Sequence, residues 1–167
     1  MILPVLQDAD VFYNLSIEQL ERISAICTTI RPSKGAIILQ ENHPGDEMYL
    51  ISRGSVDILV DPAMLGLETD ARPTTVSTLR RGQTFGEVVL VDKGLRSATV
   101  QVAEDNTVLL TMRRDDLIRL CEQDYELGYL IMRNIAADLA FKIRSTDLMV
   151  REQSLWRPKT MDGTQAV

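Results

Sequence analysis

Histidine, cysteine and aromatic residues are scarce in this chain. Its 167 residues include one histidine, two cysteines and one tryptophan, and aromatic residues make up 5%. His43 lies in an Asn-His-Pro-Gly turn, and one histidine with two distant cysteines does not supply an ordinary zinc site. These residues also form no Cys–His or Ser–His–Asp set of the kind that nucleophilic enzymes use. We therefore expect no metal and no catalytic centre, and we strongly disfavour a metal-dependent enzyme on a β-barrel.

The chain also lacks a basic excess and long apolar runs. The net charge is −6, and an acidic surface is a poor match for nucleic acid phosphates. No apolar run approaches the length that spans a bilayer, and residues 1–8 lack the basic region of a signal peptide. Cys27 and Cys121 each lie in an apolar helical pattern and should pack as small hydrophobic side chains. We expect a cytoplasmic protein without membrane insertion or direct nucleic acid binding.

The residues that are present indicate one globular domain, since 45% of them are apolar. A helix is predicted at 16–27, where Ser16 can cap the start and Gln19 completes a capping box. Across 28–113, Gly and Pro recur between short runs of Ile, Val, Leu and Thr, which predicts antiparallel strands in a sandwich or barrel. Arg53-Gly54-Ser55 is expected to join two paired strands in a tight turn.

Helical patterning returns after the strands. C-terminal helices are predicted over 114–152, the last from Tyr125 to about Val150, and a flexible tail over 153–167. Asp61–Thr75 is expected to be a long exposed connection. The apolar stripe of the last helix extends further than one small barrel should cover. Two alternatives remain: a homodimer through residues 125–150, or a simple core-facing helix.

The candidate site is Phe85–Leu90 with Arg96–Val100. Gly86 allows close backbone approach, and a helical turn over Glu87–Val91 presents unpaired N–H groups to an anion. Arg96 adds a planar cation that can grip phosphate oxygens. A carboxylate beside an anion site, such as Glu87, suits a sugar hydroxyl, so the set indicates a nucleotide. The alternative is an ordinary exposed Glu–Arg pair, which contributes little.

Three sequence blocks resemble the cyclic nucleotide-binding domain family, in the form found in catabolite activator proteins and regulatory subunits of protein kinase A. They are the glycine-spaced stretch from Lys34 to Val56, the cassette Gly82–Leu90 with Arg96–Val100, and the flanking helices. The resemblance covers about residues 5–150 and implies a mainly β fold with flanking helices. That fold is an eight-stranded antiparallel β jelly roll, or double-stranded β-helix, with an N-terminal helix and two C-terminal helices. By this resemblance the domain is expected over 1–152.

The resemblance also implies a ligand, cyclic AMP or cyclic GMP, and a role for each cassette residue. Glu87 matches the acid that accepts from the ribose 2′-hydroxyl, and Arg96 matches the arginine that pairs with the cyclic phosphate. The backbone donors and close-approach positions are Gly86, Val88, Val89 and Ala98.

Two further implications concern the base. Ser97 can bond the phosphate or a guanine amino group, so it is compatible with either nucleotide, and cyclic AMP is weakly favoured. The last helix is expected to fold over the base as a lid, with Phe141 stacked there and Lys142 or Arg144 nearby. Taken alone, Phe141 fits better as a buried core residue.

Two positions depart from the family pattern: Val89 stands where Ala is common, and Leu95 where Pro is common. They put the affinity in question more than the identity of the site. The chain after Val150 is too short for a helix-turn-helix. We expect a stand-alone sensor whose last helix signals to a second copy or to an effector protein. The alternative is an interaction or dimerisation module that keeps the fold and binds no nucleotide.

Overall fold

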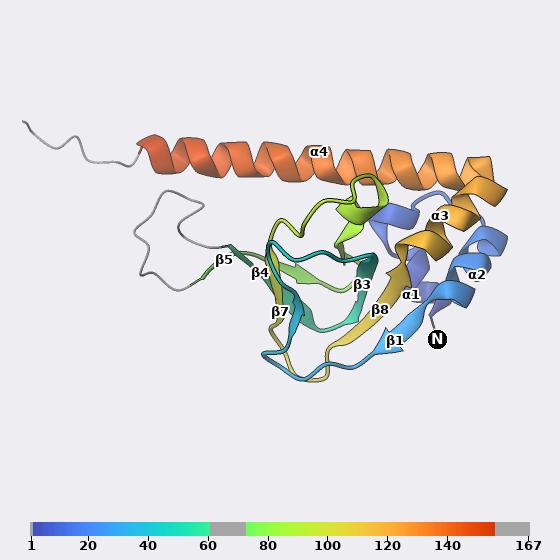
Figure 1. Ribbon diagram of the computed structural model, residues 1–167, viewed down its shortest axis with the longest axis horizontal. Coiled ribbons are helices and arrows are strands. Elements are labelled where there is room, and N and C mark those ends of the chain that lie inside the picture. The colour runs from blue at the N-terminus through green and yellow to red at the C-terminus, as the bar shows by residue number, and fades with distance from the viewer. Residues whose placement is uncertain (1, 61–72, 156–167) are drawn as a thin grey trace, which may run out of the picture.

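The computed structural model describes residues 2–60 and 73–155, with side chains up to residue 144, and shows a β-barrel with helices packed along one side (Figure 1). The helical elements are α1 (Leu3–Gln7), η1 (Asp10–Phe12), α2 (Ile17–Ile26), η3 (Glu87–Leu90), α3 (Arg114–Gln123) and α4 (Tyr125–Leu155). The strands are β1 (Thr28–Ile30), β2 (Ile37–Leu39), β3 (Glu47–Arg53), β4 (Ser55–Val60), β5 (Thr74–Arg80), β6 (Thr84–Phe85), β7 (Thr99–Val102) and β8 (Val108–Arg113).

The strands form two antiparallel sheets, ordered β1-β8-β3-β6 and β2-β7-β4-β5. Most neighbours in each sheet are distant in sequence, as expected for a jelly roll rather than a series of hairpins. β8 is central to the first sheet, and its alternating side chains serve two cores: Leu110 and Met112 face the helices, and Leu109 faces the second sheet. The predicted eight-stranded jelly roll with N- and C-terminal helices is confirmed.

The tight connection predicted at Arg53-Gly54-Ser55 between two paired strands is wrong. Arg53 pairs with Val108 in the first sheet, whereas Ser55 pairs with Arg80 in the second, so Gly54 carries the chain from one sheet to the other. Gly54 has φ +81°, and a Cβ there would lie 2.4 Å from Thr107 Oγ1. A glycine in left-handed conformation therefore marks a corner of the barrel, and it gave the same sequence signal as a hairpin turn.

The N-terminal helix is confirmed, with its capping box. Gln19 N donates to Ser16 Oγ at 3.2 Å, and Ser16 N donates to Gln19 Oε1 at 3.0 Å. The short elements that precede this helix, α1 and η1, are not predicted from the sequence. Their apolar residues, including Leu6 and Phe12, are buried in the helix-side core, and Asn134 of α4 donates to the carbonyls of Val11 and Tyr13. Short elements of this kind form through tertiary packing and carry little local periodicity.

Over residues 125–144, where the side chains of α4 are described, its fully buried apolar side chains lie near the start of the helix. Leu127, Leu130, Ile131 and Ile135 are buried, whereas Ile143 is 62% exposed. Phe141 is 64% exposed, so the expectation that it is a buried core residue is wrong: it lies on the part of the helix beyond the core. In this view the far end of α4 extends beyond both sheets (Figure 1). α4 continues to Leu155, into the stretch predicted as tail.

The remainder of the predicted tail, 156–167, lies outside the described residues, as does 61–72 of the predicted connection. Neither prediction is tested there. Within 2–60 and 73–155, no helix combines the length and the apolar character needed to cross a membrane.

Candidate ligand-binding site between Glu87 and Arg96

The site is built on the turn from β6 into η3. Gly86 has φ +75° and precedes Glu87–Leu90, the helical turn that the sequence predicted. A Cβ on Gly86 would lie 2.9 Å from Arg96 Nη1 and 3.0 Å from the Glu47 carbonyl oxygen. Only glycine fits here without strain or collision. The first N–H groups of such a turn have no partner within it and carry partial positive charge.

Arg96 is fixed by backbone groups from two segments. Its Nη2 donates to the Glu47 carbonyl at 2.7 Å, and its Nη1 donates to the Gly86 carbonyl at 3.2 Å. Its main chain pairs with the loop at residues 42–43, through bonds to the His43 carbonyl and from the Asn42 N–H. Within the described residues its Nε is buried and has no hydrogen-bond partner. The guanidinium is thus held in place with one buried donor unused.

Gly45 is a site residue that the sequence analysis did not find. A Cβ at Gly45 would lie 2.5 Å from both Nε and Nη2 of Arg96. Gly45 ends the Asn-His-Pro-Gly turn expected from the sequence, and the local pattern of that turn does not show that it also covers an arginine far along the chain. The sequence placed Gly45 in the right turn but gave no signal for this contact.

Glu87 is 3% exposed and forms an ion pair with α4. Its Oε1 lies 2.7 Å from Lys142 Nζ, and Lys142 Nζ lies 2.7 Å from Asp138 Oδ2, one helical turn earlier on α4. Burial lowers the pKa of Lys142, but attraction to Glu87 and Asp138 outweighs burial, so the pKa is raised above its ordinary value. In the described part of the chain, Glu87 Oε2 is buried and has no hydrogen-bond partner.

Lys142 was expected near the base, and the structure places it against the residue predicted to hold the ribose. Asp138 was not singled out at all. The one available signal was its spacing of four residues from Lys142, which favours an ion pair on a helix surface. The contact between Lys142 and Glu87 spans 55 residues and has no local signature.

Two cavities lie at the site. One, of about 280 Å³, lies beside Arg96 and is lined in part by Gln40, Asp46, Glu47 and Tyr49. Tyr49 donates to Glu47 Oε2 at 2.6 Å, and burial with the Glu47 carboxylate raises the pKa of Tyr49. The other cavity, of about 20 Å³, lies beside Lys142 and Asp138, which is space for about one water molecule.

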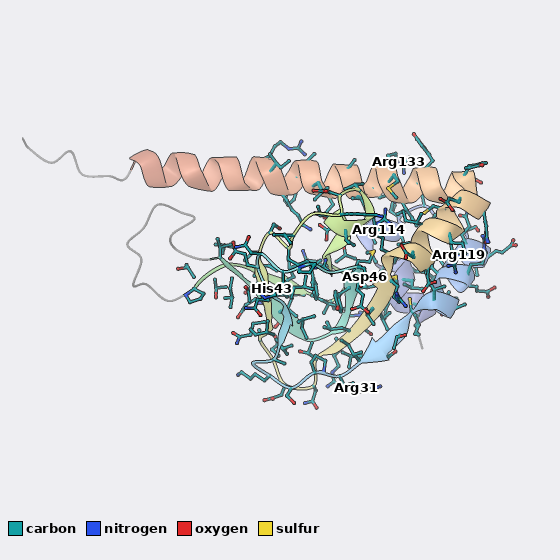
Figure 2. The ribbon with its side chains drawn as sticks, viewed as in Figure 1. Arg31, His43, Asp46, Arg114, Arg119 and Arg133 are labelled. Carbon is teal, nitrogen blue, oxygen red and sulfur yellow. The ribbon has the colours of Figure 1, made fainter. Side chains whose placement is uncertain are left out.

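The remaining cassette residues divide between core and surface. Val89 is buried in the helix-side core, so the larger side chain at this position is accommodated there. Val88, Leu95 and Ser97 are exposed, and Ala98 is half-buried. The Val89 carbonyl accepts from Arg114 Nε at 2.9 Å, and Arg114 N donates to the Asp46 carbonyl at 2.7 Å. Figure 2 shows Asp46 and Arg114 close together, where α3 meets the barrel.

The His43 side chain is exposed on the loop that pairs with the main chain of Arg96, and in Figure 2 it lies away from α4. Across the described ranges, no group of three or more His, Cys, Asp or Glu side chains is arranged to hold a metal ion. Cys27 and Cys121 are free and half-buried against the helix-side core, and burial raises the pKa of Cys27 to about 12. They pack as small hydrophobic side chains, as predicted.

Comparison with known proteins points to one family. Residues 30–124, more than half of the chain, match the model of the cyclic nucleotide-binding domain. The chain is 30% identical over 127 residues to cGMP-dependent protein kinase, isozyme 1, of Drosophila melanogaster, covering 72% of this chain and 16% of the kinase. It is 27% identical over 143 residues to the cyclic AMP receptor protein of Thermus thermophilus, covering 86% of this chain and 61% of that protein. The chain therefore spans less than two thirds of these relatives.

A solved structure has the same fold. It is a cyclic nucleotide-binding domain from Methylobacillus flagellatus, with a TM-score of 0.75 and 22% identity over 91% of this chain and 82% of that one. Together with the match to the family model, the cassette geometry and the confirmed jelly roll lead to one conclusion. The chain belongs to the cyclic nucleotide-binding domain family.

Proposed function

We propose that this chain binds cyclic AMP or cyclic GMP at the cassette and acts as a regulatory domain without catalytic activity of its own. One observation carries the proposal: among the described residues, Glu87 Oε2 and Arg96 Nε are both buried and unpaired. A buried acceptor and a buried donor without partners each cost free energy. A sugar hydroxyl and a phosphate oxygen are the complementary groups for these two atoms.

The proposed roles follow from this pairing. Glu87 accepts from the ribose 2′-hydroxyl, and Arg96 with the first N–H groups of η3 holds the cyclic phosphate. Gly86 allows the close approach, and Val88, Val89 and Ala98 contribute backbone contacts. The cavity of about 280 Å³ beside Arg96 supports ligand access at this end. We propose that the domain extends over 1–152, since the helices that precede the strands and those that follow them in the sequence share one core.

The identity of the base is a finer proposal. The names of the two curated relatives include both nucleotides, cyclic GMP and cyclic AMP. Ser97 is exposed at the site, and its hydroxyl is compatible with either. We favour cyclic AMP, with Phe141 on α4 as the residue that stacks on the base.

The proposed output is a change in α4 that a second copy or an effector protein detects in the cytoplasm. A nucleotide-free interaction module is the second candidate. It is favoured by the exposed apolar side chains of α4, Tyr129, Phe141 and Ile143. The contact of Lys142 with Glu87 Oε1 also favours this candidate, because a side chain of α4 already occupies part of the site.

The test is calorimetric titration of the wild type, Arg96→Ala and Arg119→Ala with each nucleotide. Arg119 is an exposed arginine on α3 and serves as the matched control. We expect micromolar or tighter binding that Arg96→Ala weakens by roughly 2–3 kcal/mol and Arg119→Ala leaves unchanged. If neither nucleotide binds the wild type at millimolar concentration, the interaction module becomes the better account.

A further inference from the structure

The Lys142 side chain links the far part of α4 to the cassette. Its ammonium contacts two carboxylates, Glu87 Oε1 and Asp138 Oδ2, each at 2.7 Å. The Glu87 side chain is almost fully buried, whereas those of Lys142 and Asp138 are about one third exposed. Asp138, Lys142 and Glu87 thus form a row of alternating charges, from the partly exposed surface of α4 to the buried cassette.

This arrangement uses only one oxygen of Glu87. Lys142 occupies Oε1, and among the side chains described, those up to residue 144, the buried Oε2 has no hydrogen-bond partner. If Lys142 competed with the ligand, it would bond to the Glu87 oxygen that the ligand needs. Lys142 instead holds the carboxylate by its other oxygen and leaves Oε2 unpaired.

Charge gives Lys142 a second effect. A carboxylate as buried as that of Glu87 costs free energy when it has no cation beside it. Lys142 balances the charge of the Glu87 carboxylate at 2.7 Å, and a hydrogen bond to a charged acceptor is stronger than one between neutral groups. Lys142 thus sets both the orientation and the strength of the acceptor.

Asp138 explains how a flexible lysine can hold a fixed position. The lysine side chain is a flexible four-carbon stem, and an acid four residues earlier on the same helix restrains it. Asp138 and Lys142 have this spacing on α4, which is anchored to the barrel by Leu127, Ile131 and Ile135. The position of α4 is therefore transmitted to Glu87 through two charged contacts.

We propose that Lys142, held by Asp138, is a positioning residue that presents Glu87 Oε2 to the ribose 2′-hydroxyl. This inference rests on the proposed function, because it assumes that a cyclic nucleotide occupies the cassette. It adds a residue on α4 that determines how well the site distinguishes a ribose from a deoxyribose. It also makes α4 docking and nucleotide binding favour each other, since linkage between two such events is reciprocal.

The test is a thermodynamic cycle in which the Lys142 side chain and the 2′-hydroxyl of the ligand are removed separately and together. Calorimetry measures binding of cyclic AMP and of 2′-deoxy cyclic AMP to the wild type, Lys142→Met, Lys142→Arg and Asp138→Asn. The matched control is Arg133→Met, on the outward face of α4 (Figure 2). Circular dichroism and thermal melting confirm that each variant is folded.

We expect the wild type to prefer cyclic AMP over the deoxy analogue roughly 10- to 100-fold, as for a hydrogen bond to a charged acceptor. Lys142→Met should reduce this preference to about threefold or less, because the Glu87 carboxylate loses the contact that orients it. Asp138→Asn should reduce it partly, Lys142→Arg should retain most of it, and Arg133→Met should not change it. A loss of affinity that is equal for both nucleotides would indicate a purely structural role for Lys142.

The outcomes separate the two proposals. If the wild type binds neither nucleotide, the proposed function fails, and this inference fails with it. If the wild type binds and prefers the ribose, but Lys142→Met keeps that preference, the function stands and the inference is wrong. If Lys142→Met binds more tightly, Lys142 is a competitor for the site, which also overturns the inference.

Discussion

The two ends of the cassette are held by different kinds of contact. Arg96, at the proposed phosphate end, is fixed by backbone carbonyls of Glu47 and Gly86. Glu87, at the proposed ribose end, is fixed by a side chain from α4. Backbone contacts within the barrel persist as long as the barrel is folded, whereas the Lys142 contact requires α4 to be docked. The phosphate end is thus preorganised, and the ribose end depends on the helix.

Gly86→Ala should have the largest effect, because it disturbs both ends. The methyl group would enter a left-handed backbone and approach Arg96 Nη1 to 2.9 Å, so Arg96 must shift. We expect affinity for either nucleotide to fall more than about 100-fold, measured by calorimetry, from strain and the displaced arginine together.

Gly35→Ala is the matched control for this substitution. Gly35 has φ +83°, but a Cβ at this position would meet no atom within 4 Å, so the variant tests backbone strain alone. Its free energy of unfolding should fall by about 1 kcal/mol with nucleotide binding unchanged. Equal loss of binding in both variants would show that strain, and not contact with Arg96, determines the Gly86 result.

Arg96→Lys sharpens the comparison at the phosphate end. Lysine keeps the charge but loses the planar fork, so we expect affinity to fall by roughly 2 kcal/mol. The loss should be the same for cyclic AMP and its 2′-deoxy analogue, because the ribose end is held independently. A larger loss for cyclic AMP would contradict the separation of the two ends.

Lys142→Met tests the ribose end without any ligand. Removing the cation leaves Glu87 buried and unpaired, and we expect the free energy of unfolding to fall by about 1–2 kcal/mol at neutral pH, with allowance for the partial exposure of Lys142. The folded-state pKa of Lys142 is raised above its ordinary value of 10.5, so this stabilisation is fully present below that pH and is lost as pH rises through the folded pKa.

Urea unfolding of both proteins from about pH 7 to about pH 11.5 provides the measurement for this prediction. The difference between wild type and variant should shrink at the alkaline end. A difference that stays constant across the range would mean that the lysine stabilises the fold through packing of its stem and not through its charge.

Ser97→Ala should have the smallest effect. The hydroxyl is exposed at the site and is not needed for the Glu87 and Arg96 contacts. We expect cyclic GMP affinity to fall by about 1 kcal/mol and cyclic AMP affinity by less, measured by competition calorimetry. An equal loss for both would place the hydroxyl on the phosphate and not on the base.

The sequence predicted the residues of the cassette better than the groups that contact them, for a physical reason. Gly86, Glu87 and Arg96 lie close together in the chain, and each has a residue-specific chemical role, so local reasoning was sufficient. The partners of these residues come from elsewhere: Gly45 from another loop, Lys142 and Asp138 from α4. Contacts over such separations depend on how elements pack, which local patterns do not specify.

The errors in the fold have the same origin. Gly54 gave a turn signal, but whether a turn joins paired strands or crosses between sheets depends on the partners of those strands. Phe141 fits an apolar helical pattern, but the core ends before it, and only the length of the barrel determines where. The jelly roll itself was predictable, because alternation and turn residues are local and the resemblance supplied the topology.

Arg114 connects the cassette, the loop that covers Arg96 and the start of α3. Its main-chain N–H donates to the Asp46 carbonyl in that loop, and its side chain donates to the Val89 carbonyl in the cassette. It is also the first residue of α3, which leads directly into α4. A tilt of the cassette relative to that loop must either strain one of these bonds or rotate the start of α3. Under the proposed function, a displacement of the cassette on ligand binding would reach α3 and α4 through Arg114.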